Sequence, residues 1–137
     1  MIKPKLEWDN KYSVKVKEID DQHKKMFDTI NHLIDILGSN PTQEQLNEII
    51  KALVEYKQFH FATEEKYFDE FKYEGTEEHK NAHKIFNEKL EEIVKISHGD
   101  VATLAFKLVD FLEDWLIDHL MVEDQKYIAC FQQHGLK

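Results

Sequence analysis

The chain has 137 residues, 42% of them hydrophobic, which is enough for one domain with a single apolar core. It contains four glycines and two prolines, too few for an all-β fold with many tight turns. Its formal net charge of -9 argues against binding to nucleic acid or to an anionic membrane surface.

Residues 1–18 are expected to form an arm that precedes the helices. Tyr12, Val14 and Val16 alternate with polar residues, as they would in an extended segment that lies across the helices. The arm lacks the apolar stretch of a secretion signal, and the chain lacks any apolar run of the roughly 18 residues that a membrane span needs. We therefore expect a cytoplasmic protein without membrane insertion. The single cysteine, Cys130, cannot form an internal disulfide, which agrees with a reducing compartment.

Four amphipathic segments follow the arm, each with apolar residues at spacings of three and four. They cover about residues 20–37, 42–71, 76–97 and 100–132. Asp20 is the expected N-cap of the first segment, and Gly38 its expected end. Thr42 and Gln45 form an expected capping box on the second, and Asp100 is the expected cap of the fourth.

The joins between these segments are short, so successive helices should be antiparallel neighbours. The predicted fold is therefore all-α, an antiparallel up-down four-helix bundle with an extended N-terminal arm. We expect residues 1–137 to form a single domain, and we favour a monomer.

Polar side chains interrupt the apolar face of every predicted helix. They are His23, His60, Glu64, His79, His83 and His119. Burying these groups without partners would cost several kcal/mol, so they must satisfy one another or share a ligand. By contrast, we expect three further histidines to lie in solvent, namely His32, His98 and His134.

The spacing of these side chains favours a metal ion as the shared ligand. His60 and Glu64 are four residues apart, so they project from one face of a helix, and His79 and His83 repeat this arrangement. Facing helices of a bundle commonly hold metals in this way, and imidazole suits iron, copper, zinc or nickel. Either pair alone is often a coincidence, but the contribution of all four helices favours a metal over a metal-free bundle.

Asp124 completes the set only if the last helix is irregular. It follows His119 by five residues, which in a regular α-helix places it about 140° away. A slip of one residue would align the two side chains, and it would also place Tyr127, Ile128 and Phe131 on the apolar face. We therefore predict a π-bulge between His119 and Asp124, a feature often found at functional sites.

These motifs resemble the hemerythrin family. The resemblance rests on His23 together with HFATE at 60–64, HKNAH at 79–83 and HLMVED at 119–124. The stretches LEWDNKYSV, IDDQH and WLIDH also look like those of its bacterial single-domain members. The resemblance covers nearly the whole chain and fills all seven ligand positions with the expected residue type.

The resemblance implies a non-haem centre of two iron ions joined by an oxo or hydroxo bridge. One iron would be bound by His79, His83 and His119, and the other by His23 and His60, with Glu64 and Asp124 bridging the two. The second iron would keep an open position, where molecular oxygen would bind. Leu116, Trp115 and Tyr127 would lie around this pocket, although plain core packing explains each of them equally well.

The expected function is therefore reversible binding of molecular oxygen, for carriage, storage or delivery, and not catalysis. One alternative is a di-iron enzyme or scavenger that acts on peroxide, oxygen or nitric oxide. Another is an oxygen or redox sensor, which we favour less because such sensors are usually fused to signalling domains. Zinc could also occupy the same ligands. Cys130 is expected to be an inert packing residue.

Overall fold

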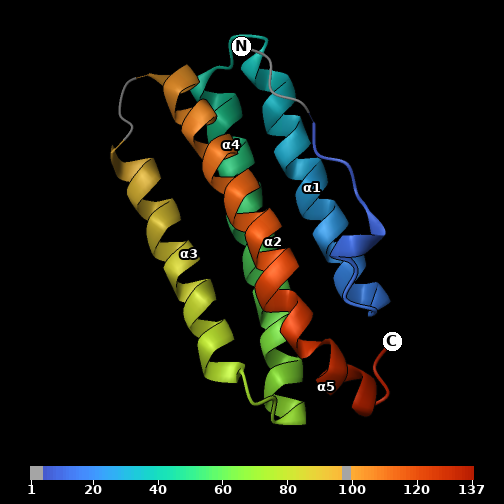
Figure 1. Ribbon diagram of the computed structural model, residues 1–137. Coiled ribbons are helices and arrows are strands. Elements are labelled where there is room, and N and C mark those ends of the chain that lie inside the picture. The colour runs from blue at the N-terminus through green and yellow to red at the C-terminus, as the bar shows by residue number, and fades with distance from the viewer. Residues whose placement is uncertain (1–4, 97–99) are drawn as a thin grey trace.

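The computed structural model describes residues 5–96 and 100–137, and every regular element within these ranges is helical. The long helices are α1 (Lys17–Leu37), α2 (Gln43–Phe71), α3 (Thr76–Ile96) and α4 (Val101–Asp118), and a short α5 (Ile128–Gln133) follows. The turn between α1 and α2 lies at one end of the molecule, and the turn between α2 and α3 lies at the other (Figure 1). The predicted all-α four-helix bundle is confirmed.

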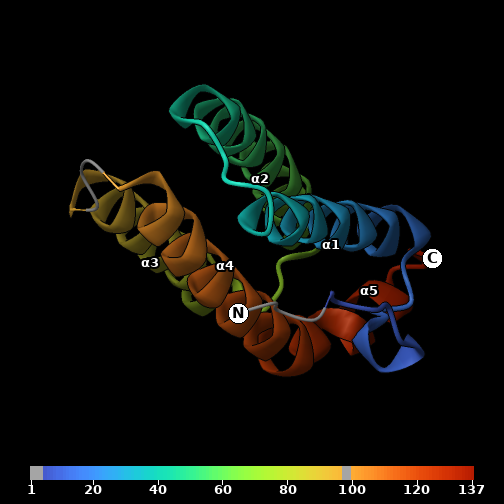
Figure 2. The same cartoon turned by 90° about the horizontal axis from the view of Figure 1, so that it is seen from above.

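Each of the four long helices packs against at least two of the others. α1 contacts α2 and α4, and α3 contacts the same two helices, as the end-on view shows (Figure 2). The described residues include no helix that is long and apolar enough to cross a membrane.

The helix ends follow local side-chain chemistry, with one exception. Thr42 and Gln45 form the expected capping box, and the Asp100 carboxylate accepts a hydrogen bond from the backbone of Thr103. The predicted cap at Asp20 is wrong, because α1 already begins at Lys17. The Asp20 carboxylate instead accepts hydrogen bonds from the residues before the helix and thereby holds that segment in place.

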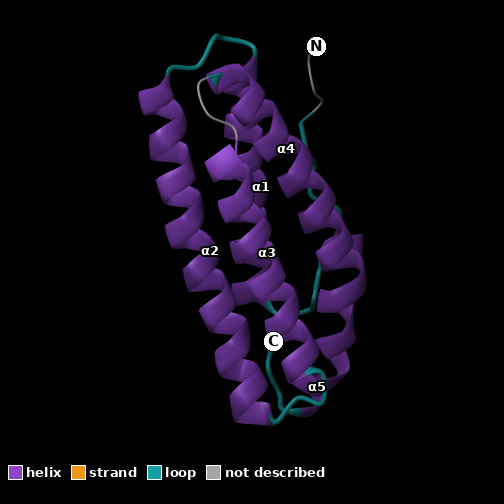
Figure 3. Cartoon of the chain, turned by 90° about the vertical axis from the view of Figure 1, so that its left-hand side faces the viewer, coloured by secondary structure: helices purple, strands orange, loops and turns teal. Residues whose placement is uncertain are grey.

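The segment before α1 runs along the length of the bundle (Figures 1 and 3). A 3-10 helix at Asn10–Tyr12 interrupts it, so it is not the uniformly extended arm that we expected. Val14 and Val16 are fully buried, and Leu6 exchanges two backbone hydrogen bonds with the Asn31 amide, at 2.7 and 2.9 Å. These contacts make the segment part of the folded domain.

Among the residues that the structure describes, the apolar core consists of two clusters, one on each side of the polar side chains. The larger cluster includes Ile30, Leu33, Leu46, Phe86, Leu108 and Leu112. The smaller one is formed by Val14, Val16, Ile19, Phe68, Tyr127 and Phe131. Burial of each large side chain stabilises the fold by about 1.5–3 kcal/mol. On α2, Glu64 falls between Phe61 of the larger cluster and Phe68 of the smaller one.

The last helix changes its geometry where the π-bulge was predicted. Residues His119–Glu123 form a π-helical segment, in which the N–H of Asp124 donates to the carbonyl of His119. A 3-10 segment, Asp124–Tyr127, then leads into α5. Tyr127 and Phe131 are fully buried whereas Lys126 is exposed, so the predicted slip of one residue is confirmed.

Candidate metal centre

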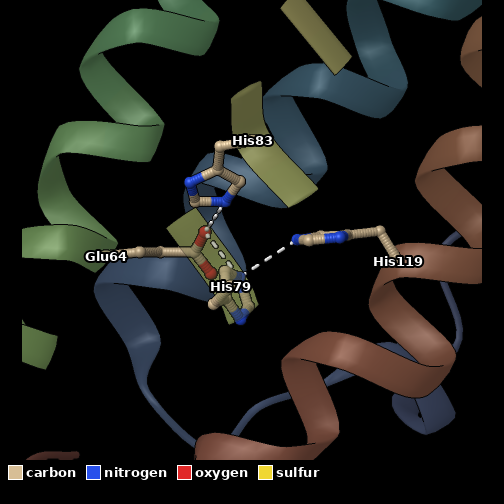
Figure 4. A group of neighbouring side chains, drawn as sticks. All are labelled: Glu64, His79, His83 and His119. Atoms are coloured by element: carbon tan, nitrogen blue, oxygen red, sulfur yellow. Dashed lines mark hydrogen bonds and ion pairs between the residues drawn. The ribbon is translucent and has the colours of Figure 1, made fainter. Parts of the chain in front are cut away.

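The six polar residues on the predicted apolar faces, and Asp124, all lie inside the bundle. None of the seven is more than 4% exposed. Figure 4 shows Glu64, His79, His83 and His119 pointing toward one another from three different helical segments. His32 and His134 are exposed as expected, and His98 lies outside the described residues.

The side chains form two groups that have one member in common. Potential ligand atoms of Glu64, His79, His83 and His119 lie within 4.8 Å of one another. Those of His23, His60 and Glu64 do so as well. Glu64 Oε1 lies 3.1 Å from His83 Nε2 and 3.4 Å from His60 Nε2, so a single carboxylate faces both groups.

Asp124 faces both groups through its two different oxygens. Its Oδ1 lies 2.9 Å from His119 Nε2 and 3.1 Å from His79 Nε2. Its Oδ2 lies 3.2 Å from His23 Nε2. The π-helical segment makes this possible, because it turns Asp124 onto the same face as His119.

The unpaired atoms of this cluster fit metal cations. Glu64 Oε1, His83 Nε2 and both Asp124 carboxylate oxygens are buried without a hydrogen-bond partner. The Nε2 atoms of His23 and His60 face each other at 3.0 Å, and those of His79 and His119 at 3.1 Å. Such a pair of nitrogens can share one proton at most, so lone pairs converge on two points where cations would satisfy them.

The electrostatics of the cluster also suit cations. Burial raises the pKa of Asp124, but His119, His23 and His79 outweigh this effect and hold it well below its usual range. Burial alone would lower the pKa of His79, yet the nearby carboxylates of Asp124 and Glu64 raise it to about 10. The His79 ring is therefore a cation, protonated on both nitrogens, at neutral pH, and a bound metal would replace the proton on Nε2.

His60 behaves in the opposite way. Burial lowers its pKa to about 3, so its ring is neutral, which is the form that binds metals. Its Nδ1 lies 2.6 Å from the Gln22 side-chain oxygen, so the hydrogen is on Nδ1 and the Nε2 lone pair points into the cluster.

Aromatic side chains surround the cluster. Trp115 stacks on His119, with ring centroids 4.2 Å apart, and Phe61 stacks on His83 at 3.7 Å. The Tyr127 hydroxyl donates to Glu64 Oε2 over 2.6 Å. Leu116 is buried in the larger apolar cluster one turn before His119. Trp115 and Tyr127 thus contact potential ligands directly.

Two residues at the site were missed in the sequence. Gln22 contacts His60, and the Glu65 carboxylate lies 2.9 Å from His83 Nδ1. Each is the chain neighbour of a predicted ligand and reaches across to a ligand on the next helix. Gln22 also follows Ile19 by three residues, so its place on the apolar face was a usable signal. Nothing comparable distinguishes Glu65 from the many other carboxylates on helix surfaces.

Comparison with known proteins supports a family assignment. Residues 14–131 match the family described as "Hemerythrin HHE cation binding domain". The chain is 28% identical to a bacteriohemerythrin of Clostridium acetobutylicum over 88% of this chain and 97% of that protein. It is 30% identical to a bacteriohemerythrin of Pseudomonas aeruginosa, covering 90% and 79% of the two chains. It is also 31% identical to myohemerythrin-1 of Phascolopsis gouldii, covering 88% and 89%.

Proposed function

The chain belongs to the hemerythrin family, and from this premise we propose that its buried cluster holds two non-haem iron ions and binds molecular oxygen reversibly. The observation that carries the proposal is the pair of overlapping ligand groups. Glu64 belongs to both groups, and the two oxygens of Asp124 face one group each. A single metal would have no need of two such carboxylates.

We assign the ligands according to these groups. His79, His83 and His119 would hold one iron, and His23 and His60 the other, with Glu64 and Asp124 between them. The second ion would thus receive one histidine fewer, which leaves room for a small ligand. An oxo or hydroxo bridge would complete the centre.

The donor set favours reversible binding over oxidation. Two ferrous ions would supply the two electrons that oxygen binding requires. Five neutral imidazoles and two carboxylates give the site little negative charge, so it stabilises highly oxidised iron less than a carboxylate-rich site would. The surrounding Leu116, Trp115 and Phe61 side chains exclude water, which opposes the loss of bound oxygen in a reduced form.

Optical spectra of the iron-loaded protein test this function. The ferrous protein should develop a visible absorption band in air, and the band should disappear under vacuum and return through several cycles. Loading with close to two iron ions per chain should accompany it, and His60→Ala should abolish it. Rapid consumption of oxygen or peroxide with an added reductant would contradict the carrier function and favour an enzyme.

A further inference from the structure

Two of the potential histidine ligands make hydrogen bonds through Nδ1, the ring nitrogen that faces away from the cluster, and the two acceptors differ in charge. His60 donates from Nδ1 to the neutral amide oxygen of Gln22, at 2.6 Å. His83 donates from Nδ1 to a carboxylate oxygen of Glu65, at 2.9 Å. These histidines belong to different ligand groups, so each half of the centre has its own kind of partner.

A chain of hydrogen bonds fixes the orientation of Gln22. The Thr63 hydroxyl donates to the backbone carbonyl of Phe59 and can therefore accept from the Gln22 amide nitrogen, at 3.2 Å. This contact leaves the amide oxygen of Gln22 for His60. Gln22 is only 5% exposed, so water does not compete for it. The hydrogen bond to Thr63 thus fixes the Gln22 side chain so that its neutral amide oxygen accepts from His60.

Glu65 differs from Gln22 in charge and in exposure. Its side chain is 33% exposed, while that of His83 is only 3% exposed. A carboxylate can only accept here, so the hydrogen resides on His83 Nδ1 and the Nε2 lone pair faces Glu64. Hydrogen bonds to an ionised acceptor are roughly twice as strong as those between neutral groups.

The acceptor that binds the Nδ1 hydrogen of a histidine ligand influences the reduction potential of the metal on Nε2. A carboxylate draws the Nδ1 proton toward itself and makes the imidazole a more basic ligand. A more basic ligand stabilises the more oxidised metal ion, which lowers its reduction potential. A neutral amide does this less.

We propose that Glu65 and Gln22 are positioning residues that make the two halves of the centre unequal in reduction potential. Glu65 lowers the potential of the metal held by His83, and Gln22 leaves that of the metal held by His60 higher. The half with fewer histidines is then the more readily kept reduced. This inference rests on the proposed di-iron centre, but not on oxygen binding.

A redox titration of the iron-loaded full chain, followed by its optical spectrum, tests this inequality. Glu65→Gln should raise the lower of the two midpoint potentials and so narrow the gap between the two reduction steps. The expected change is about tenfold in the oxidised-to-reduced ratio at a fixed potential, or about 59 mV for one electron. Gln22→Glu should remove the difference in charge from the other side, because both histidines then face a carboxylate; it should lower the higher midpoint potential and so also narrow the gap. The double exchange, Gln22→Glu with Glu65→Gln, should reverse the order of the two potentials.

Asp69→Asn is the matched control, because Asp69 lies one turn beyond Glu65 on α2 and pairs with Lys80 rather than with a ligand. It removes the same charge and should shift the midpoints much less than Glu65→Gln. Equal shifts in the two variants, or an unchanged gap in Glu65→Gln, would overturn the inference.

Zinc binding to the metal-free chain provides a readout that involves neither redox chemistry nor oxygen. Glu65→Gln should weaken zinc binding by roughly tenfold or more, and Asp69→Asn should not. Equal zinc affinities in Glu65→Gln and the parent chain would also overturn the inference.

The inference and the proposed function can fail separately. If the midpoint potentials shift as expected while no reversible oxygen band forms, the proposed oxygen binding is wrong and the inference stands. If Gln22→Glu fails to fold, the redox titration and the zinc titration of Glu65→Gln decide alone, since Glu65 is partly exposed and its replacement is tolerated more easily.

Discussion

Tyr127 and Glu64 form a hydrogen-bonded pair in which both side chains are fully buried. The hydroxyl satisfies the one Glu64 oxygen that does not face the histidines, and so it holds the carboxylate in a single orientation. Burial is also the main reason why the pKa of Tyr127 lies well above its ordinary value, so that it remains a donor. The resemblance to the family had placed Tyr127 near the pocket, but only the structure identifies its partner.

Tyr127→Phe should therefore destabilise the metal-free protein. It leaves a buried carboxylate oxygen without its donor, which costs roughly 1–3 kcal/mol. Urea unfolding followed by circular dichroism would measure the change. Tyr67→Phe is the matched control, because the Tyr67 hydroxyl makes a bond of the same length to Glu18 at an exposed position. A loss as large in Tyr67→Phe would contradict the argument from burial.

His79 makes metal binding dependent on pH. Its pKa of about 10 in the metal-free chain lies above the ordinary 6.5, so at neutral pH an incoming metal must displace a proton. The apparent affinity for a divalent metal should thus rise with pH, by up to about tenfold between pH 7 and pH 8 from this residue alone. Calorimetry in buffers of different ionisation enthalpy would count the released proton. An affinity that stays flat over this range would refute the prediction.

The π-helical segment His119–Glu123 needs support from outside its own helix, because the altered pairing changes which carbonyl groups are satisfied. The Gln125 amide donates to the carbonyl of Leu120 at 3.1 Å and to that of Ser13 at 3.3 Å. One side chain thus joins the irregular turn to the segment before α1. That segment in turn is held by Asp20 on α1.

Gln125→Ala should loosen this junction. We expect a loss of about 1 kcal/mol in unfolding free energy and faster release of metal to a chelator, since Asp124 is the adjacent residue. Gln132→Ala serves as the control, because Gln132 is an exposed residue of α5. Equal metal release rates in the two variants would show that the junction does not position Asp124.

The parts of this architecture differed in how far the sequence could predict them. The long helices and the slip before Asp124 followed from apolar periodicity, since the pattern itself shifts by one residue there. The 3-10 turn at Asn10–Tyr12 did not, because alternating Tyr12, Val14 and Val16 can be buried by more than one backbone path. The start of α1 was misjudged because Asp20 has the chemistry of a cap, whereas tertiary contacts recruit it elsewhere.

For the whole molecule, the centre brings together buried side chains from four helical segments, which are also joined by apolar packing and by hydrogen bonds nearer the surface. Because a bound metal adds binding energy to the folded state alone, its removal by a chelator should lower the midpoint of thermal unfolding. The corresponding loss in the free energy of unfolding is about 4 kcal/mol when the free metal concentration exceeds the dissociation constant a thousandfold. His32→Ala should keep this dependence because His32 is exposed, while His60→Ala should lose it. A chelator-insensitive midpoint in the parent chain would argue for a metal-free bundle.

The two apolar clusters on either side of the centre have a further consequence for hydrogen exchange. Neither cluster runs continuously into the other, since a layer of histidines and carboxylates separates them. Without metal, the smaller cluster around Phe68 and Phe131 should behave as a separate cooperative unit whose amides exchange sooner than those near Leu108. With metal bound, both sets of amides should exchange together, because opening either unit would then require breaking ligand bonds.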